Sequence, residues 1–500
     1  MKPLLFSFSF LICITSVFSQ ALVNNVGAGV YLMPGAYMIV KTNSVHNQSG
    51  TIENGGQLVI EGNIQNDANL LGSTTAPTGF YRVQGDWINN ASVISNQDSV
   101  ELFGNNQQIT GTTPTTFNNL ILSGNNTAIK TQTVDAYVAG FLDLKDVELA
   151  TQNKNMVVLN PATNSIKYSL LSSDYGFVSS LDTGKLIRHT NTISSYYYPL
   201  GTPTSTGNPF YYRPLEIKPT SASTNSFGVR LAKDPTAETY NVNSLDNLLC
   251  KVNPLYYHRI NHPQGTDAAD VKFLFDVAND KRWTDVGHWE TNRWNYTNTA
   301  SASTSGGFNT LEIKNWNDYD PQPFALASKK FTVDAGPDQI LFSGQSASLN
   351  PTIGTSYVAS YTWSPDLALD ASTIRNPTAT PTSNTVYTLK VIDDLGCEVS
   401  DSLLIKIKNE GLLIPTAFSP NKDGYNDIFR VLNDNIEEFT MLVFNRWGEK
   451  VYETSDIRDG WDGSYKDVAQ DVGVYVWNVS YRLRGDSKRQ SQSGNVTLVK

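Results

Sequence analysis

The sequence predicts an all-β protein of several domains, on three observations. Asn, Thr, Ser and Gly are abundant, while charged residues make up only 17% of the chain. Good helix formers never gather into a long amphipathic run. Apolar residues occur instead in short pieces interrupted by Gly, Asn and Pro, which is typical of strands joined by turns. A chain of 500 residues has room for three or four such domains.

Residues 1–19 are expected to form a secretory signal peptide. Lys2 supplies the positive end, and an apolar core runs from Leu4 to Val17. Small residues precede a cut ahead of Gln20. The apolar run is shorter than the roughly 20 residues that a membrane span needs, which favours cleavage over anchoring. No transmembrane segment is expected in the mature chain.

Charge and cysteine content narrow the class of protein further. The net charge is −10, and no cluster of Lys and Arg offsets it, so a nucleic-acid partner is not expected.

The mature chain would hold Cys250 and Cys397, which fall in different predicted domains. Two distant cysteines make no disulfide framework, so both are expected to be unpaired and buried.

Residues 20–165 are expected to form a repeat region that resembles a β-solenoid. Short apolar pieces end at a glycine about every 20 residues, which approaches the period of stacked parallel coils. Asn residues at the corners suit side-chain ladders. The irregular spacing also fits an antiparallel sandwich, so both folds stay open. The marker glycines are Gly62, Gly85, Gly104, Gly124 and Gly140.

Residues 166–328 are expected to form an antiparallel β-sandwich rich in aromatic residues. Trp283, Trp289 and Trp294 lie close together in sequence. Exposed tryptophans would provide a platform for stacking sugar rings. Large aromatic residues dominate protein cores, so a place in the core is favoured over the carbohydrate site.

No motif indicates an enzyme. His258 and His262 are four residues apart, but no Glu beside them supplies the general base of a zinc protease, and they are expected in exposed loops. His288 shows no recognisable partner spacing. The chain has no nucleophile elbow, no phosphate loop and no paired-Cys zinc spacing. The expectation is therefore no catalytic residues and no enzymatic activity.

Residues 329–409 are expected to form an immunoglobulin-like spacer. The segment has about 80 residues of short strands with turn signals. Trp363 lies in the middle of one strand, and Tyr387 begins an alternating one. The segment resembles the polycystic-kidney-disease-type and related Ig-like repeats of bacterial surface proteins.

Residues 410–500 carry the most specific pattern, four motifs in a fixed order. Tyr475, Trp477, Val479 and Tyr481 should share one face of a strand. Val474 and Val476 point to the other face, and the start of this strand is expected to be buried on both sides. Trp447 is expected in the core. The motif residues are Pro420, Asn421, Asp423, Gly424, Asn426 and Asp427, then Asn445, Arg446, Trp447 and Gly448, then Trp461, Asp462 and Gly463, and finally Gly473 and Tyr475.

These motifs closely resemble the gliding-motility-associated C-terminal domain, the type B sorting domain of the type IX secretion system. Asp467 and Asp471 depart from the Gly and Pro expected there, which affects only the shape of a loop. The resemblance implies a bacterium of the Bacteroidetes type and export in two steps. Its expected partners are the type IX translocon and outer-membrane components. The expected location is the cell surface or the medium.

A weak calcium site is also predicted in this module. Asn421, Asp423, Asn426 and Asp427 bring four oxygen-bearing side chains into seven residues, and calcium prefers such ligands. The alternative is a turn whose side chains bond to their own backbone. The turn is favoured, and no other cofactor is expected.

The sequence thus predicts an exported structural or adhesin-like surface protein, with a role in gliding left open. The alternative is a secreted protein that binds or acts on carbohydrate, with a surface glycan as its ligand.

Overall fold

The computed structural model describes residues 23–73, 78–125, 127–168, 176–204, 211–233, 240–298, 300–319, 322–408, 412–433, 436–484 and 488–500. The signal peptide expected at residues 1–19 lies outside them. The fold is nearly all β, as predicted. The chain divides into two compact units: Met1–Lys330 with Asp393–Glu398, and Phe331–Ile392 with Val399–Lys500. Within the described ranges, no helix is long and apolar enough to span a membrane.

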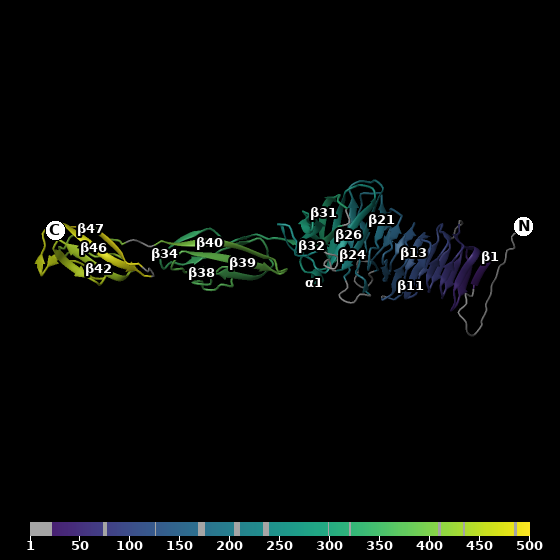
Figure 1. Cartoon of the computed structure of the whole chain (residues 1–500), viewed down its shortest axis with the longest axis horizontal. Coiled ribbons are helices and arrows are strands. Elements are labelled where there is room, and N and C mark those ends of the chain that lie inside the picture. Colours follow the sequence, from purple (N-terminus) through teal and green to yellow (C-terminus); the bar gives the residue numbers. More distant parts are fainter. Residues whose placement is uncertain are drawn as a thin grey trace. The chain divides into compact units, whose positions relative to one another are not determined.

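The N-terminal region is a β-solenoid, which decides between the two folds left open by the sequence. One sheet takes a single strand from each successive coil, and every pair in it is parallel. Figure 1 shows the strands of the coils stacked between the labels β1 and β13. The strands of this sheet are β2 (Tyr37–Val40), β4 (Gln57–Ile60), β7 (Phe80–Val83), β10 (Ser99–Leu102), β13 (Asn119–Leu122), β16 (Leu142–Asp143) and β19 (Ile166–Lys167), the last preceded by the 3-10 turn η1 (Thr163–Ser165).

Further parallel strands form the other faces of the coils. One sheet holds β1 (Val23–Leu32), β3 (Val45–Asn54), β5 (Ile64–Asn66), β6 (Asn69–Gly72), β8 (Trp87–Asn89), β9 (Ser92–Ile94), β11 (Asn106–Gly111), β14 (Ile129–Gln132), β17 (Glu148–Ala150) and β20 (Phe177–Ser179). Another begins with β12 (Thr115–Phe117), β15 (Ala136–Val138), β18 (Met156–Val158) and β21 (Leu186–Thr190). The parallel pairs of β17 with β20 and of β18 with β21 carry the coils beyond the boundary expected at residue 165.

The marker glycines allow the corners of adjacent coils to approach closely. A Cβ atom at Gly85 would lie 2.5 Å from the carbonyl carbon of Gly62, and one at Gly104 would lie 2.0 Å from the carbonyl oxygen of Gln84. Both distances are below any van der Waals contact. The period of about 20 residues therefore marks the places where a side chain would push two coils apart.

A ladder of asparagine side chains runs along the inside of one corner. Asn25 donates from Nδ2 to Oδ1 of Asn47 at 2.8 Å, Asn47 to Asn66 at 2.9 Å, and Asn66 to Asn89 at 3.0 Å. All four residues are at most 4% exposed. Buried amides need such partners, and the ladder supplies one from each neighbouring coil, as the sequence predicted.

The last coil passes directly into the aromatic-rich β-sandwich, because β21 pairs antiparallel with β24. A single continuous core extends from Val40 in the solenoid to Leu326 in the sandwich. The sandwich strands are β22 (Tyr196–Tyr198), β23 (Leu215–Pro219), β24 (Asn225–Lys233), β25 (Leu249–Val252), β26 (Tyr256–Gln264), β27 (Ala269–Phe275), β28 (Asp285–Glu290), β29 (Arg293–Tyr296), β30 (Ala300–Ser305), β31 (Phe308–Trp316) and β32 (Pro323–Lys329), with the short helix α1 (Val277–Asp280).

His258 lies inside this sandwich, and His262 is half-buried on the same strand, so the expectation that both lie in exposed loops is wrong. His258 belongs to β26, is 1% exposed, and donates from Nε2 to the carbonyl oxygen of Arg213 at 3.0 Å. Burial lowers the pKa of His258 to about 4. The apolar neighbours on β26 account for the burial, since Tyr256, Tyr257 and Ile260 are all in the core.

Acid is therefore expected to destabilise the sandwich through His258. The imidazole is neutral when folded but gains a proton below pH ~6.5 when unfolded. Its contribution to stability is full above that value and is lost as the pH falls toward about 4. The loss should reach about 3 kcal/mol. Denaturant titrations at several pH values should show that His258→Gln has a shallower acid loss than the wild type. An identical pH profile for the two proteins would contradict the prediction.

The immunoglobulin-like module has its own core in the second unit. Trp363 is 1% exposed, and Tyr387, Leu389 and Val391 are fully buried along one face of β39. Trp363 is therefore a core residue, but it lies near the end of its strand rather than in the middle, which the sequence had suggested. The strands are β33 (Val333–Asp334), β34 (Gln339–Phe342), β35 (Ala347–Ser348), β36 (Thr352–Ile353), β37 (Val358–Ser364), β38 (Thr378–Ala379), β39 (Thr385–Asp393) and β40 (Glu398–Lys408).

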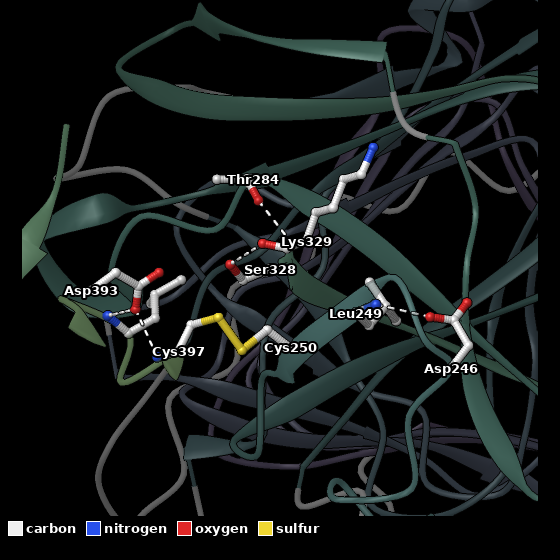
Figure 2. Close-up of a disulfide and its surroundings, with 9 residues drawn as sticks. Asp246, Leu249, Cys250, Thr284, Ser328, Lys329, Asp393 and Cys397 are labelled. Carbon is white, nitrogen blue, oxygen red and sulfur yellow. Dashed lines mark hydrogen bonds between the residues drawn. A yellow bond between two sulfur atoms is a disulfide. The ribbon is translucent and has the colours of Figure 1, made fainter. Parts of the chain in front are cut away.

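The prediction that Cys250 and Cys397 are unpaired is wrong, because they form a disulfide across 147 residues. Cys397 lies in the turn between β39 and β40, whose residues 393–398 group with the first unit. Figure 2 shows the bond, with Asp393 accepting from the backbone N–H of Cys397 at 2.7 Å. Leu395 of the same turn packs against the core of the first unit. The tertiary fold brings the strand of Cys250 and the turn of Cys397 together, which the linear spacing does not reveal.

Candidate functional site

The C-terminal module is the candidate site, because it carries the four ordered motifs. Its main sheet has the strand order β41-β47-β46-β42-β43, and the buried residues of its core lie between Phe418 and Leu498. The strands are β41 (Ala417–Phe418), β42 (Ile436–Phe444), β43 (Lys450–Thr454), β44 (Ser464–Tyr465), β45 (Val468–Ala469), β46 (Gly473–Leu483) and β47 (Gln490–Leu498).

Trp461 joins the first and third motifs at the centre of this core. It is fully buried, and its backbone exchanges two hydrogen bonds with Phe429, at 2.8 and 2.9 Å. Its ring centroid lies 5.3 Å from that of Phe418 and 4.6 Å from that of Tyr475. The indole Nε1 donates to the carbonyl oxygen of Ser464 at 2.7 Å. The ring is thus fixed by both apolar packing and a satisfied donor.

The neighbours of Trp461 close the same corner. Asp462 accepts from the backbone N–H of Ser464 at 2.9 Å and from its hydroxyl at 2.7 Å, and the bond from that hydroxyl lowers the pKa of Asp462. Gly463 has φ +83°, and a Cβ there would lie 3.0 Å from Pro420. The Pro420 and Gly463 motifs, far apart in sequence, therefore meet in one packed corner.

The second motif is the turn between β42 and β43, and the expected burial of Trp447 is wrong. The side chain of Asn445 accepts from the backbone N–H groups of Trp447 and Glu449, each at 3.0 Å, and Gly448 has φ +78°. The strand therefore ends before Trp447, and strand alternation no longer decides where that side chain points. Trp447 is 83% exposed. The guanidinium of Arg446 lies 5.9 Å from its ring centroid.

The loop of the first motif is a set of Asx turns. Asp427 accepts from the backbone N–H groups of Lys422 at 2.6 Å and Gly424 at 2.8 Å. Asn421 accepts from the N–H of Asp423, and Asp423 from that of Tyr425. Asn426 has φ +53°, and its carbonyl accepts from the N–H of Ser419. These hydrogen bonds from side chains to the local backbone are the ones expected for the turn alternative. Calcium binding by the loop stays a prediction.

The fourth motif begins β46, which is buried on one face only. Gly473 opens the strand. Tyr475, Trp477, Val479 and Tyr481 are at most 6% exposed, as the alternation predicted. The expected burial on both faces is wrong, since Val474 is 55% and Val476 is 45% exposed. Among the described residues of the module, no strand covers that face of the central strand β46, so both valines remain on the surface.

The tryptophans considered for sugar stacking are core residues. Trp294 is fully buried, Trp283 is 8% exposed and Trp289 is 9% exposed. Tyr240 packs edge-on against both Trp289 and Trp294, with ring centroids 5.3 and 6.3 Å apart. A stacking platform needs exposed ring faces, but Tyr240, Trp289 and Trp294 pack against one another, and Trp283 is buried in the main core. The geometry therefore agrees with the core alternative.

The sequence analysis did not predict one cluster of potential metal ligands in the sandwich. His288, Glu290 and Asp318 each offer a ligand atom within 4.8 Å of the others. The i, i+2 spacing of His288 and Glu290 was a usable signal, because such residues share one face of a strand. Asp318 lies 28 residues beyond Glu290 in sequence, and no local pattern connects it to them.

The arrangement of the four motifs agrees with a comparison against known families. Residues 412–498 match the CHU_C type IX secretion signal domain. All fifteen motif residues lie inside the CHU_C domain. A type IX signal implies interaction with the secretion machinery and export to the cell surface or the extracellular space.

Other comparisons add little beyond the CHU_C domain. No curated protein matches the chain. Dimeric latent PorU from Porphyromonas gingivalis is 8% identical with a TM-score of 0.14, and the match covers 58% of this chain and 32% of PorU. A mixed-linkage glucan-utilisation protein, SGBP-B of Bacteroides ovatus, is 9% identical with a TM-score of 0.12, covering 57% of this chain and 80% of that one. Likenesses this low support no inference about fold or function.

Proposed function

We propose that this chain is a structural or adhesin-like protein of the cell surface, delivered by the type IX system through its CHU_C domain. The observation that carries the proposal is the CHU_C match over residues 412–498. The buried corner of Trp461 and the exposed turn of Trp447 give that domain both a stable core and a projecting surface. A receptor of the secretion system can recognise such a projecting surface on a folded protein.

The remaining domains support a structural rather than an enzymatic role. The solenoid and the sandwich share one continuous core, which makes them a single rigid body that offers long β surfaces. The Ig-like module adds a further sandwich before the CHU_C domain. Extended β surfaces of this kind suit adhesion to a partner surface. The carbohydrate alternative loses its main support, because Trp283, Trp289 and Trp294 are buried.

Truncation tests the proposal directly. The full chain and a version ending at Asn409 would be expressed in the native host, and periplasm, surface and medium would be fractionated. We expect the truncated protein to accumulate in the periplasm and the full chain to reach the surface or the medium. The reason is that the truncation removes the complete core of the CHU_C domain while leaving the cores of the other domains intact.

A fusion provides the matched control. A reporter that carries the signal peptide and residues 410–500, but none of residues 20–409, should also leave the cell. Equal export of the full and truncated chains would overturn the sorting role. Export together with no binding to cells or surfaces, in a comparison with a strain lacking the protein, would overturn the adhesive role.

A further inference from the structure

The sandwich contains a group of metal-ligating side chains that comes from both of its sheets. His288 and Glu290 lie on β28, in the sheet that also holds β29 and β32. Asp318 follows β31, which pairs with β27 and β30 in the opposing sheet. His288 Nδ1 lies 3.0 Å from Oε1 of Glu290. One ligand atom from each of the three residues lies within 4.8 Å of the other two.

The imidazole is held in place by aromatic packing. His288 is 1% exposed. Its ring stacks on Phe324 with centroids 4.4 Å apart and meets Trp316 edge-on at 5.0 Å. Trp316 in turn donates from Nε1 to the carbonyl oxygen of Asp318, which ties the third residue to the same packing. A ligand fixed in this way loses little conformational freedom when it binds.

The two carboxylates face the solvent side of this group. The Glu290 side chain is 42% exposed, and Asp318 is exposed. Zinc binds histidine nitrogen and carboxylate oxygen at about 2.0–2.2 Å, which in a tetrahedral site places the ligand atoms roughly 3.3 Å apart. The distance of 3.0 Å between Nδ1 of His288 and Oε1 of Glu290 is already close to that spacing.

We propose that His288, Glu290 and Asp318 bind a divalent transition-metal ion, with zinc the best fit, and that this ion links the two sheets of the sandwich. Imidazole nitrogen suits zinc and neighbouring transition metals, whereas calcium prefers an all-oxygen shell. Two carboxylates balance the charge of the ion. Three protein ligands with an exposed side leave a fourth position for water. The role is structural, because the ion would tie β28 of one sheet to the segment that follows β31 of the opposing sheet.

Zinc titration of the untagged mature chain, after treatment with chelator, tests this proposal. Isothermal titration calorimetry should show one zinc ion bound per chain, and saturating zinc should raise the Tm of the first unit. Cobalt should quench the fluorescence of Trp316, whose ring is 5.0 Å from that of His288. The double variant Glu290→Gln, Asp318→Asn should weaken zinc binding at least tenfold. Both changes are isosteric and lie at exposed positions, so the variant should fold.

Glu312→Gln provides the matched control. Glu312 is a partly exposed carboxylate on β31 that pairs with Lys314 rather than with His288. The control should bind zinc like the wild type. Failure of the wild type to bind zinc at millimolar concentrations would overturn the proposal, leaving only the His288–Glu290 hydrogen bond. Equal affinity in the double variant and the wild type would overturn it as well. Neither outcome depends on whether the chain is exported.

Discussion

Replacing Cys250 and Cys397 together with alanine is expected to lower the free energy of unfolding by about 5 kcal/mol. The disulfide closes a loop with a sequence separation of 147 residues. A cross-link removes conformational entropy from the unfolded chain, and the effect grows with the length of the closed loop. Equilibrium unfolding in guanidinium, followed by tryptophan fluorescence, measures the difference.

Two controls separate the covalent bond from the contacts around it. Asp394→Ala removes an ion pair in which Oδ2 of Asp394 lies 3.8 Å from Nε of Arg282, and both side chains are largely exposed. This substitution should change the free energy of unfolding by less than about 1 kcal/mol. Dithiothreitol should destabilise the wild type and leave the double alanine variant unchanged. Two free thiols in the denatured, unreduced wild-type protein would contradict the prediction.

Trp461→Ala should destabilise the CHU_C domain by about 3–5 kcal/mol. The substitution empties the centre of a core where Phe418 and Tyr475 pack on the indole. It also removes the donor that satisfies the carbonyl of Ser464. Urea denaturation of a fragment spanning residues 410–500, which contains the whole of this core, measures the loss.

Trp447→Ala is the matched control, the same substitution at a residue that is 83% exposed. It should change the stability of the fragment by no more than about 0.5 kcal/mol. If Trp447 belongs to the surface that the secretion machinery reads, this variant should fold normally yet leave the cell less efficiently. Similar losses of stability in the two variants would contradict the assignment of Trp461 to the core and Trp447 to the surface.

The sequence predicted those features that depend on local periodicity. The glycines at Gly62, Gly85 and Gly104 indicated stacked coils because steric exclusion at each corner imposes the period. The alternation from Tyr475 to Tyr481 indicated one buried face because strand geometry has a period of two. Both signals lie within a short stretch of chain and need no knowledge of distant contacts.

The features that were missed depend on where a strand ends or on which strands meet. Trp447 looks like a core residue, but the side chain of Asn445 starts a turn and cancels the alternation. His258 is buried because β26 lies inside its sheet between β24 and β32. Cys250 and Cys397, like His288 and Asp318, come together through tertiary packing between elements that lie far apart in sequence. Local pattern carries no information about such distant partners.

The asparagine ladder of the solenoid has a direction. Each amide from Asn25 to Asn66 donates toward the next coil, so the side-chain dipoles point the same way and add along the stack. Asn25 ends the row by accepting from the N–H of Ala28, and Asn89 ends it by donating to the carbonyls of Thr113 and Pro114. The row therefore behaves as one polarised element. An interior substitution such as Asn66→Asp would split it into two shorter rows of dipoles and add a buried charge that opposes them. A substitution at either end would only shorten the row.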